Sequence, residues 1–146
     1  MITLMLSLSF YQLTLLVSTT TLHQSVRVQG KLVCNGTGYS DAKVILFQGL
    51  LVPLKLAEAK PTKTGDFTVV WSGAKLGKIS PTVNTYHKCL YHQPLKFCSR
   101  MLSIQVPSDY VITDSDRINA TFNIGITNLN IKYSFEIIDC IFGSFS

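Results

Sequence analysis

Short segments in which apolar and polar residues alternate constrain the fold of this chain more than any other feature of its sequence. The clearest spans residues 26–34, and the same alternation returns in residues 119–124 and 129–133. A period of two is typical of β-strands that bury one face and expose the other. No segment combines a sustained helical period with good caps. The chain is therefore expected to be all-β.

Turn-forming residues separate these segments from other strand-like runs. Glycine, asparagine and aspartate gather at residues 35–38 and 64–66, as is usual in turns. Pro53 restricts the short run after it to an edge strand, and Ser72-Gly73 is expected to end another strand. Seven or eight short strands with regular turns predict an antiparallel sandwich of two sheets. The further strands are expected at residues 43–48, 54–56, 67–71, 83–89, 98–106, 118–124 and 126–138, the last two meeting at Gly125.

The first part of the chain has the pattern of a secretory signal peptide. Residues 4–17 are mostly apolar, small residues follow them, and no Lys, Arg, Asp or Glu precedes Arg27. The apolar run is short for a membrane-spanning helix, and no later run is long enough to span. A buried first strand or helix is the alternative interpretation.

This pattern predicts a secreted, extracellular chain with no transmembrane segment. We expect cleavage between Val17 and Gln24. The predicted organisation is a leader over residues 1–24 and one β-sandwich domain over residues 25–146.

Four cysteines follow the predicted leader: Cys34, Cys89, Cys98 and Cys140. An even number in an exported chain implies disulfides, and four cysteines allow three connectivities. The short stretch between Cys89 and Cys98 can close a loop between neighbouring strands. We therefore expect these two to pair, which leaves Cys34 to pair with Cys140.

A metal site is the competing interpretation of the same region. His87, Cys89, His92 and Cys98 lie at short spacings, and zinc is held by such ligands in tetrahedral sites. That alternative requires reduced cysteines, whereas export favours the disulfide. Without the metal, His87 is expected to be a buried, hydrogen-bonded histidine next to the disulfide.

Two Asn-x-Ser/Thr sequons agree with export. They begin at Asn35, in a glycine-rich turn, and at Asn119, at the start of an expected strand. Both are predicted glycosylation sites.

The charge of the chain argues against a nucleic-acid partner. The formal net charge is +5, which raises affinity for anionic partners in general. The basic residues are scattered singly, however, and no run of like charges forms a binding arm.

A set of motifs occurs in a fixed order after the predicted leader. The most distinctive is residues 79–89, where a proline is followed by an asparagine and then by Tyr-His-Lys-Cys. The ordered set resembles the nematode transthyretin-like family, in which the corresponding signature is a proline, an Asn or similar residue, and Tyr-His-x-Cys. The other matching segments are residues 30–34, 42–47, 63–67, 98–100 (Cys-Ser-Arg), 106–111, 122–129 and 139–140.

The resemblance implies a secreted, transthyretin-type sandwich of two antiparallel sheets. One segment departs from the family: residues 48–56 are apolar where relatives usually carry acidic residues, so a cation site that depends on those carboxylates is not expected. We expect Leu50, Leu51 and Val52 to be buried. The alternative is that this loop forms an exposed contact surface.

The fold also has an enzymatic relative, because the hydroxyisourate hydrolases resemble transthyretin. Those enzymes end in Tyr-Arg-Gly-Ser, whereas this chain has neither Tyr nor Arg before Gly143-Ser144. No Gly-x-Ser-x-Gly turn offers a nucleophile. We therefore expect no catalytic residues and no cofactor.

The predicted function is an extracellular binding protein of the transthyretin-like family. Its ligand would be a lipid, a small hydrophobic molecule or a cell-surface protein. A hydrolase and a Cys/His metal-binding protein remain the alternatives.

Overall fold

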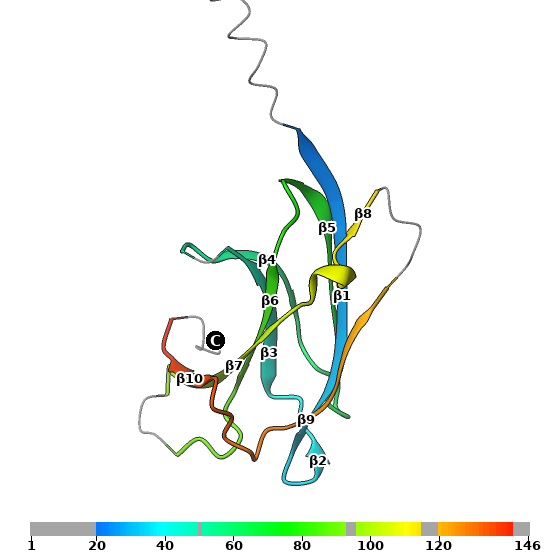
Figure 1. Cartoon of the computed structure of the whole chain (residues 1–146). Helices are drawn as coiled ribbons and strands as arrows, with labels where there is room; N and C mark the ends of the chain where they lie inside the picture. Colours follow the sequence, from blue (N-terminus) through cyan, green and yellow to red (C-terminus); the bar gives the residue numbers. More distant parts are fainter. Residues whose placement is uncertain (1–19, 50, 93–95, 115–119, 142–146) are drawn as a thin grey trace, which may run out of the picture.

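The computed structural model describes residues 20–49, 51–92, 96–114 and 120–141. These residues form ten strands, arranged as two five-stranded sheets (Figure 1). The elements are β1 (Thr21–Cys34), β2 (Thr37–Gly38), β3 (Ala42–Gln48), β4 (Leu54–Ala59), β5 (Asp66–Leu76), β6 (Pro81–His87), β7 (Ser99–Gln105), the 3-10 turn η1 (Ser108–Tyr110), β8 (Ile112–Thr113), β9 (Phe122–Asn128) and β10 (Glu136–Asp139).

The long strand β1 organises the first sheet, since β2, β5, β8 and β9 all pair with it. The second sheet has the order β10-β7-β6-β3-β4. All pairings are antiparallel except that of β1 with β9, which is parallel. The predicted all-β sandwich of two sheets is confirmed, with this one parallel pair and with β2 and β8 as additional two-residue strands.

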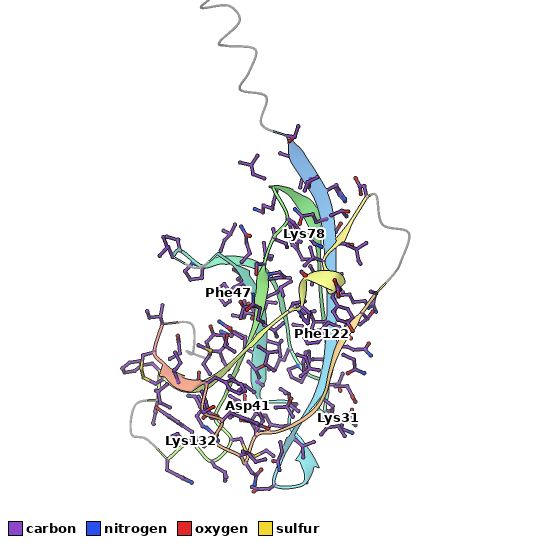
Figure 2. The ribbon with its side chains drawn as sticks, viewed as in Figure 1. Lys31, Asp41, Phe47, Lys78, Phe122 and Lys132 are labelled. Carbon is purple, nitrogen blue, oxygen red and sulfur yellow. A yellow bond between two sulfur atoms is a disulfide. The ribbon has the colours of Figure 1, made fainter. Side chains whose placement is uncertain are left out.

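The core lies between the two sheets, where alternate side chains of facing strands meet (Figure 2). Val26 and Val28 of β1 are at most 1% exposed, and Val44 and Leu46 of β3 are fully buried. Such alternation on both inner faces is what aligned sheet packing requires. The apolar positions of the sequence therefore form one continuous core.

Strand β5 does not end at Ser72-Gly73, as the sequence predicts, but continues to Leu76. Its pairing with β1 continues to the register Thr21↔Leu76. A Cβ atom at Gly73 would lie 2.7 Å from Cζ2 of Trp71. Gly73 therefore provides space for the indole ring within the strand instead of ending it.

Strand β1 begins at Thr21, earlier than the sequence predicts. Gln24 in this first part is 1% exposed. Its Nε2 donates to the carbonyl of Gly77 at 2.7 Å, and its Oε1 accepts from the N–H of Ile79 at 2.9 Å. Gln24 thus fastens the β5–β6 connection to β1. Residues 1–19, which contain most of the predicted leader, lie outside the described residues.

The end of the chain also differs from the prediction. Strand β9 continues through Gly125, which has a φ of 82°, and β1 and β9 change register there. Residues 129–133 form turns instead of the predicted strand. The final strand, β10, is short and pairs with β7.

The β3–β4 loop is exposed, so the prediction that it is buried is wrong. Leu51 is 97% exposed and Val52 is 81% exposed, while Leu50 lies outside the described residues. The two sheets meet on the inner faces of β3 and β4, whereas this loop lies beyond the last paired residues, Gln48 and Leu54. The alternative of an exposed apolar surface is the one that the structure favours.

Candidate functional site

Two disulfides are present, but their pairing differs from the predicted one. Cys34 bonds to Cys89 with a Cα–Cα distance of 6.0 Å, and Cys98 bonds to Cys140 with a Cα–Cα distance of 4.0 Å. The predicted pairs, Cys89–Cys98 and Cys34–Cys140, are therefore wrong.

Strand placement explains the observed pairing. Cys34 ends β1 in one sheet, and Cys89 follows β6 in the other, so their bond joins the two sheets. Strand β10 lies beside β7 in the register Asp139↔Ser99. That register brings Cys140 next to Cys98.

Arg100 lies at the base of the loops near these bonds and is only 7% exposed. Its Nε and Nη2 donate to the two carboxylate oxygens of Glu136 at 2.5 and 2.9 Å. Its Nη1 donates to the carbonyls of Cys89 and Leu129 at 2.6 and 2.9 Å, and Nη2 also donates to the carbonyl of Ile131 at 3.1 Å. A guanidinium has five N–H donors, and all five are accounted for.

These hydrogen bonds join parts of the chain that are distant in sequence. Cys89 belongs to the β6–β7 connection, Leu129 and Ile131 belong to the β9–β10 connection, and Glu136 begins β10. Residues 129–133 do not pair as a strand despite their alternating sequence, and Arg100 binds two of their carbonyls, those of Leu129 and Ile131. Arg100 therefore fixes both connections against the end of the sandwich.

His87 is fully buried on the same strand pair as Arg100, in the register His87↔Arg100. Its Nδ1 accepts from the N–H of Cys89 at 3.2 Å, and its ring meets that of Tyr39 edge-on at 6.3 Å. The pKa of His87 is lowered to about 4, chiefly by burial and also by the positive charge of Arg100. The negative charge of Glu136 acts in the opposite direction but is the smallest of the three effects. His87 is thus a neutral, hydrogen-bonded core residue beside a disulfided cysteine, in the role that the sequence predicts.

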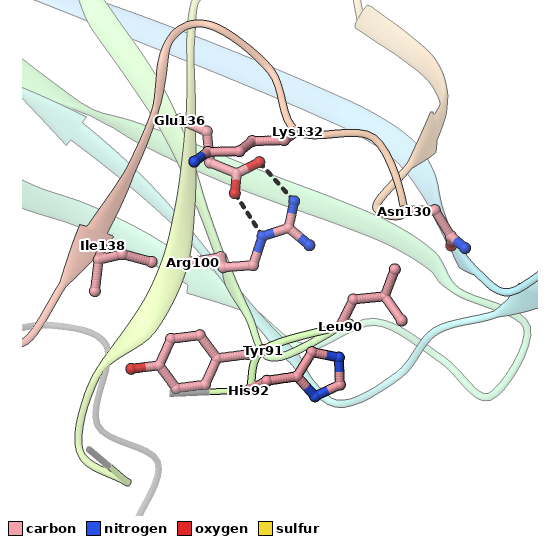
Figure 3. A pocket seen from close by; sticks show the side chains of 8 residues that line it. All are labelled: Leu90, Tyr91, His92, Arg100, Asn130, Lys132, Glu136 and Ile138. Carbon is pink, nitrogen blue, oxygen red and sulfur yellow. Dashed lines mark hydrogen bonds and ion pairs between the residues drawn. The ribbon is translucent and has the colours of Figure 1, made fainter. Parts of the chain in front are cut away.

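A hollow of about 310 Å³ opens beside the Arg100–Glu136 pair (Figure 3). Leu90, Tyr91 and His92 line it from the β6–β7 connection. This volume is at the lower end of the range for small-ligand sites, about 300–1,000 Å³. The lining is completed by Arg100, Asn130, Lys132, Glu136 and Ile138.

Comparison with known proteins places this chain in a family. A family model described as TTR-52, transthyretin-like family, matches residues 29–107, which run from within β1 to the end of β7 and include Arg100. The chain belongs to the transthyretin-like family.

Several transthyretin-like proteins of Caenorhabditis elegans are similar over most of this chain. Transthyretin-like protein 33 is 30% identical over 81% of this chain and 82% of its own length. Transthyretin-like protein 5 is 29% identical over 81% and 85%, and transthyretin-like protein 2 is 28% identical over 81% and 83%. Among solved structures, part of a 9R-lipoxygenase from Cyanothece aligns over 72% of this chain and 16% of its own, at 11% identity and a TM-score of 0.38.

Two motifs that carry the transthyretin-like resemblance converge in the structure. The Tyr-His-x-Cys motif supplies Tyr86, His87 and Cys89, and the Cys-Ser-Arg motif supplies Cys98 and Arg100. Tyr86 packs in the small cluster that also contains Ile45 and Phe47, on the opposite face of the sheet from His87. The motifs therefore build the support of the loops, not an exposed reactive group.

The structure does not assemble the alternative zinc site. The sulfurs of Cys89 and Cys98 belong to two different disulfides, His87 faces the core, and His92 lies on the surface. Over the described part of the chain, no three His, Cys, Asp or Glu side chains gather as a metal site would require. No helix within that part has the length and apolar character needed to cross a bilayer.

The structure describes the sequon at Asn35 but not the one at Asn119. Asn35 is exposed, and its turn has a φ of 52° at this residue. Its N–H donates to Oδ1 of Asn130 at 2.7 Å, while Nδ2 of Asn130 donates to Oδ1 of Asn35 at 2.8 Å. The Nδ2 atom of Asn35, to which a glycan would attach, takes no part in this pair. Asn119 lies outside the described residues.

Sequence reasoning missed the residues that shape the hollow. In the sequence, Arg100 stands out only as part of the Cys-Ser-Arg motif. Its position two residues after Cys98 is the available signal, because arginine is rarely buried and its burial cannot be expected from local pattern. Glu136 and Lys132 belong to none of the motifs found in the sequence. Their place in the hollow depends on the path of residues 129–133, two of whose carbonyls bind Arg100.

Proposed function

We propose that this transthyretin-like protein is an exported binding protein whose ligand contacts the β6–β7 and β9–β10 connections. The observation that carries the proposal is the five-donor contact of Arg100, which fixes both connections around an open hollow. Loops held by a rigid sandwich are a common form of binding site. The ligand classes to be tested are a lipid, a small hydrophobic molecule and a cell-surface protein.

Export is supported by the leader-like sequence and by the chemistry of the cysteines. All four cysteines are joined in two disulfides. Such bonds persist in oxidising compartments and are rare in the cytosol. Export also exposes Asn35 to the glycosylation machinery, and we include its modification in the proposal.

The extent of β1 supports a mature domain that begins at or before Thr21. Removal of residues 1–24 would delete Gln24 and the paired residues from Thr21 onward. A mature chain that begins at or before Thr21 retains the complete strand. The proposal therefore places cleavage in the N-terminal part of the expected window, between Val17 and Thr21.

A binding function without catalysis is part of the proposal. His87 is inaccessible and His23 contacts Asp114 at 3.2 Å on the surface, but His92 is exposed and lines the hollow, so the absence of catalysis needs its own test. The hydrolase alternative is tested by adding hydroxyisourate to the oxidised protein. Turnover above a heat-treated control would overturn the non-enzymatic part of the proposal.

The binding proposal is tested by expressing the full chain with its own leader in a eukaryotic secretory host. The protein is purified from the medium, and extracted small molecules and crosslinked cell-surface proteins are identified by mass spectrometry. We expect a ligand that is retained by the wild type and lost from the Leu90→Asn variant. Leu90 is 44% exposed in the hollow and has a φ of 53°, a conformation that asparagine adopts readily.

The matched control is Val70→Thr, because Val70 is 50% exposed on β5, away from the hollow, and threonine suits a strand. It should retain the ligand. If the protein itself stayed inside the cells with free thiols, that result would contradict export. Equal ligand recovery from the wild type and Leu90→Asn would place binding elsewhere on the protein.

A further inference from the structure

The hollow beside Arg100 carries a positive charge that the neighbouring carboxylate does not neutralise. Lys132 lines the hollow and is exposed. Among the described residues, the ion pairs are His23–Asp114, Lys55–Glu58 and Arg100–Glu136, and none includes Lys132. Within the described part of the chain, Lys132 has no hydrogen bond to another side chain either. Its ammonium group is therefore available to a ligand.

Arg100 is not available in the same way, although it also lines the hollow. Each of its five N–H donors already has an acceptor, and its charge is matched by the carboxylate of Glu136. The pair is buried, with side-chain exposures of 9% and 3%. The uncompensated charge of the hollow thus comes from Lys132, and Figure 3 shows the two bonds by which Arg100 and Glu136 pair with each other.

Apolar side chains supply the rest of the exposed surface. Leu90 is 44% exposed and Ile138 is 51% exposed, and the ring of Tyr91 also lines the hollow (Figure 3). Partly exposed apolar side chains around a concave site gain free energy when a ligand removes them from water, at roughly 25 cal/mol per Å². The hollow therefore combines an apolar wall with one available cation.

We propose that this hollow binds a small amphipathic anion, with its apolar body against Leu90 and Ile138 and its acidic group beside Lys132. The proposal rests on the proposed binding function and names the ligand class of that site. A volume of about 310 Å³ suits a compact molecule. A carboxylate gains a charge-assisted contact with Lys132 that a neutral molecule of the same shape lacks.

The test uses three compounds with one apolar body and different charges: 3-phenylpropanoate, 3-phenylpropan-1-ol and 3-phenylpropan-1-amine. Each is titrated into the oxidised, isotope-labelled mature chain and followed by amide chemical shifts. We expect the carboxylate to bind about three- to fivefold more tightly than the alcohol, because an ion pair with an exposed ammonium group is weak. The amine should bind more weakly than the alcohol, and the shifts should centre on Leu90, Tyr91, His92 and Lys132.

Two variants separate charge from shape. Lys132→Gln should abolish the preference for the carboxylate over the alcohol, and Leu90→Asn should weaken all three compounds. Lys78→Gln is the matched control, because Lys78 is exposed and lies at the opposite end of the sandwich from Lys132 (Figure 2). It should behave as the wild type.

Equal affinities for the three compounds, or a carboxylate preference that survives Lys132→Gln, would overturn the proposal. Shifts centred on other residues would do the same. If none of the compounds binds at millimolar concentration, the small-anion proposal is wrong. The binding-protein proposal would then still be decided by the ligand recovered from the secreted protein, so the two can fail separately.

Discussion

Arg100 and Glu136 form a two-point contact in which Nε and Nη2 of the guanidinium each donate to a different carboxylate oxygen, at 2.5 and 2.9 Å. The pair joins β7 to the start of β10 and is almost completely buried. A planar fork facing a carboxylate is the arrangement that arginine makes and lysine cannot. Arg100 therefore helps to hold the β9–β10 connection, together with the bonds between Asn130 and Asn35.

Removing the guanidinium should destabilise the protein strongly. In Arg100→Met, the carboxylate of Glu136 stays buried without a partner, and the carbonyls of Cys89, Leu129 and Ile131 lose their donor. We expect a loss of about 3–5 kcal/mol in the free energy of unfolding, measured by urea denaturation of the oxidised protein. The double variant Arg100→Met/Glu136→Leu should recover part of this loss, because it removes the buried charge. A single-variant loss below about 1 kcal/mol would show that the pair is solvated.

Peptide mapping of the oxidised protein should find Cys34 linked to Cys89 and Cys98 linked to Cys140. The sequence separations are 55 and 42 residues, so each bond contributes about 4 kcal/mol in the chain-entropy model. Replacing both members of either pair by serine should lower the free energy of unfolding by up to this amount. The alternative linkage of Cys89 to Cys98 would contradict the described register of β10 on β7.

The sandwich and its core could be predicted from the sequence because they depend on local alternation. The prediction of strands at residues 43–48 and 83–89 agrees with β3 and β6 to within two residues. Each of these strands is dense in apolar residues and bounded by turn-forming residues. Their hydrophobic period and their tertiary role point to the same structure.

The disulfide pairing and the candidate site could not be predicted, because both depend on where β10 lies. Nothing local to Glu136 indicates that it will meet Arg100, or that Cys140 will lie beside Cys98. The alternating residues 129–133 have the local pattern of a strand, but they form no strand, and the buried Arg100 binds the carbonyls of Leu129 and Ile131. Long-range contacts therefore decided the site against local propensity.

His87 should make stability depend on pH below neutrality. Its pKa falls from 6.5 to about 4 in the folded protein, chiefly because of burial. The unfolded chain therefore binds more protons between these values, so stability decreases as pH falls from about 6.5 to 4. The contribution is on the order of 3 kcal/mol. It is measured as the difference between urea denaturation at pH 7 and at pH 4.5.

His87→Gln should reduce this pH dependence, because glutamine does not titrate and its Oε1 can still accept from the N–H of Cys89. The surface variant His92→Gln is the control, and it should keep the pH dependence of the wild type. Because the variants differ from the wild type at one histidine only, comparing them isolates the contribution of that side chain. An unchanged pH dependence in His87→Gln would mean that His87 is accessible to protons in the native state.

Gln24 should be required for the full stability of the domain. In Gln24→Ala, the buried N–H of Ile79 and the carbonyl of Gly77 lose their partners, which costs about 1–3 kcal/mol. Gln29→Ala on the same strand is the control, because Gln29 is only half-buried, and it should change stability by less than about 0.5 kcal/mol. The mature chain should therefore retain Gln24, and mass spectrometry of the secreted protein should place its first residue at or before Thr21. A mature chain that begins after Gln24 and is as stable as one that begins at Thr21 would show that this strand end is dispensable.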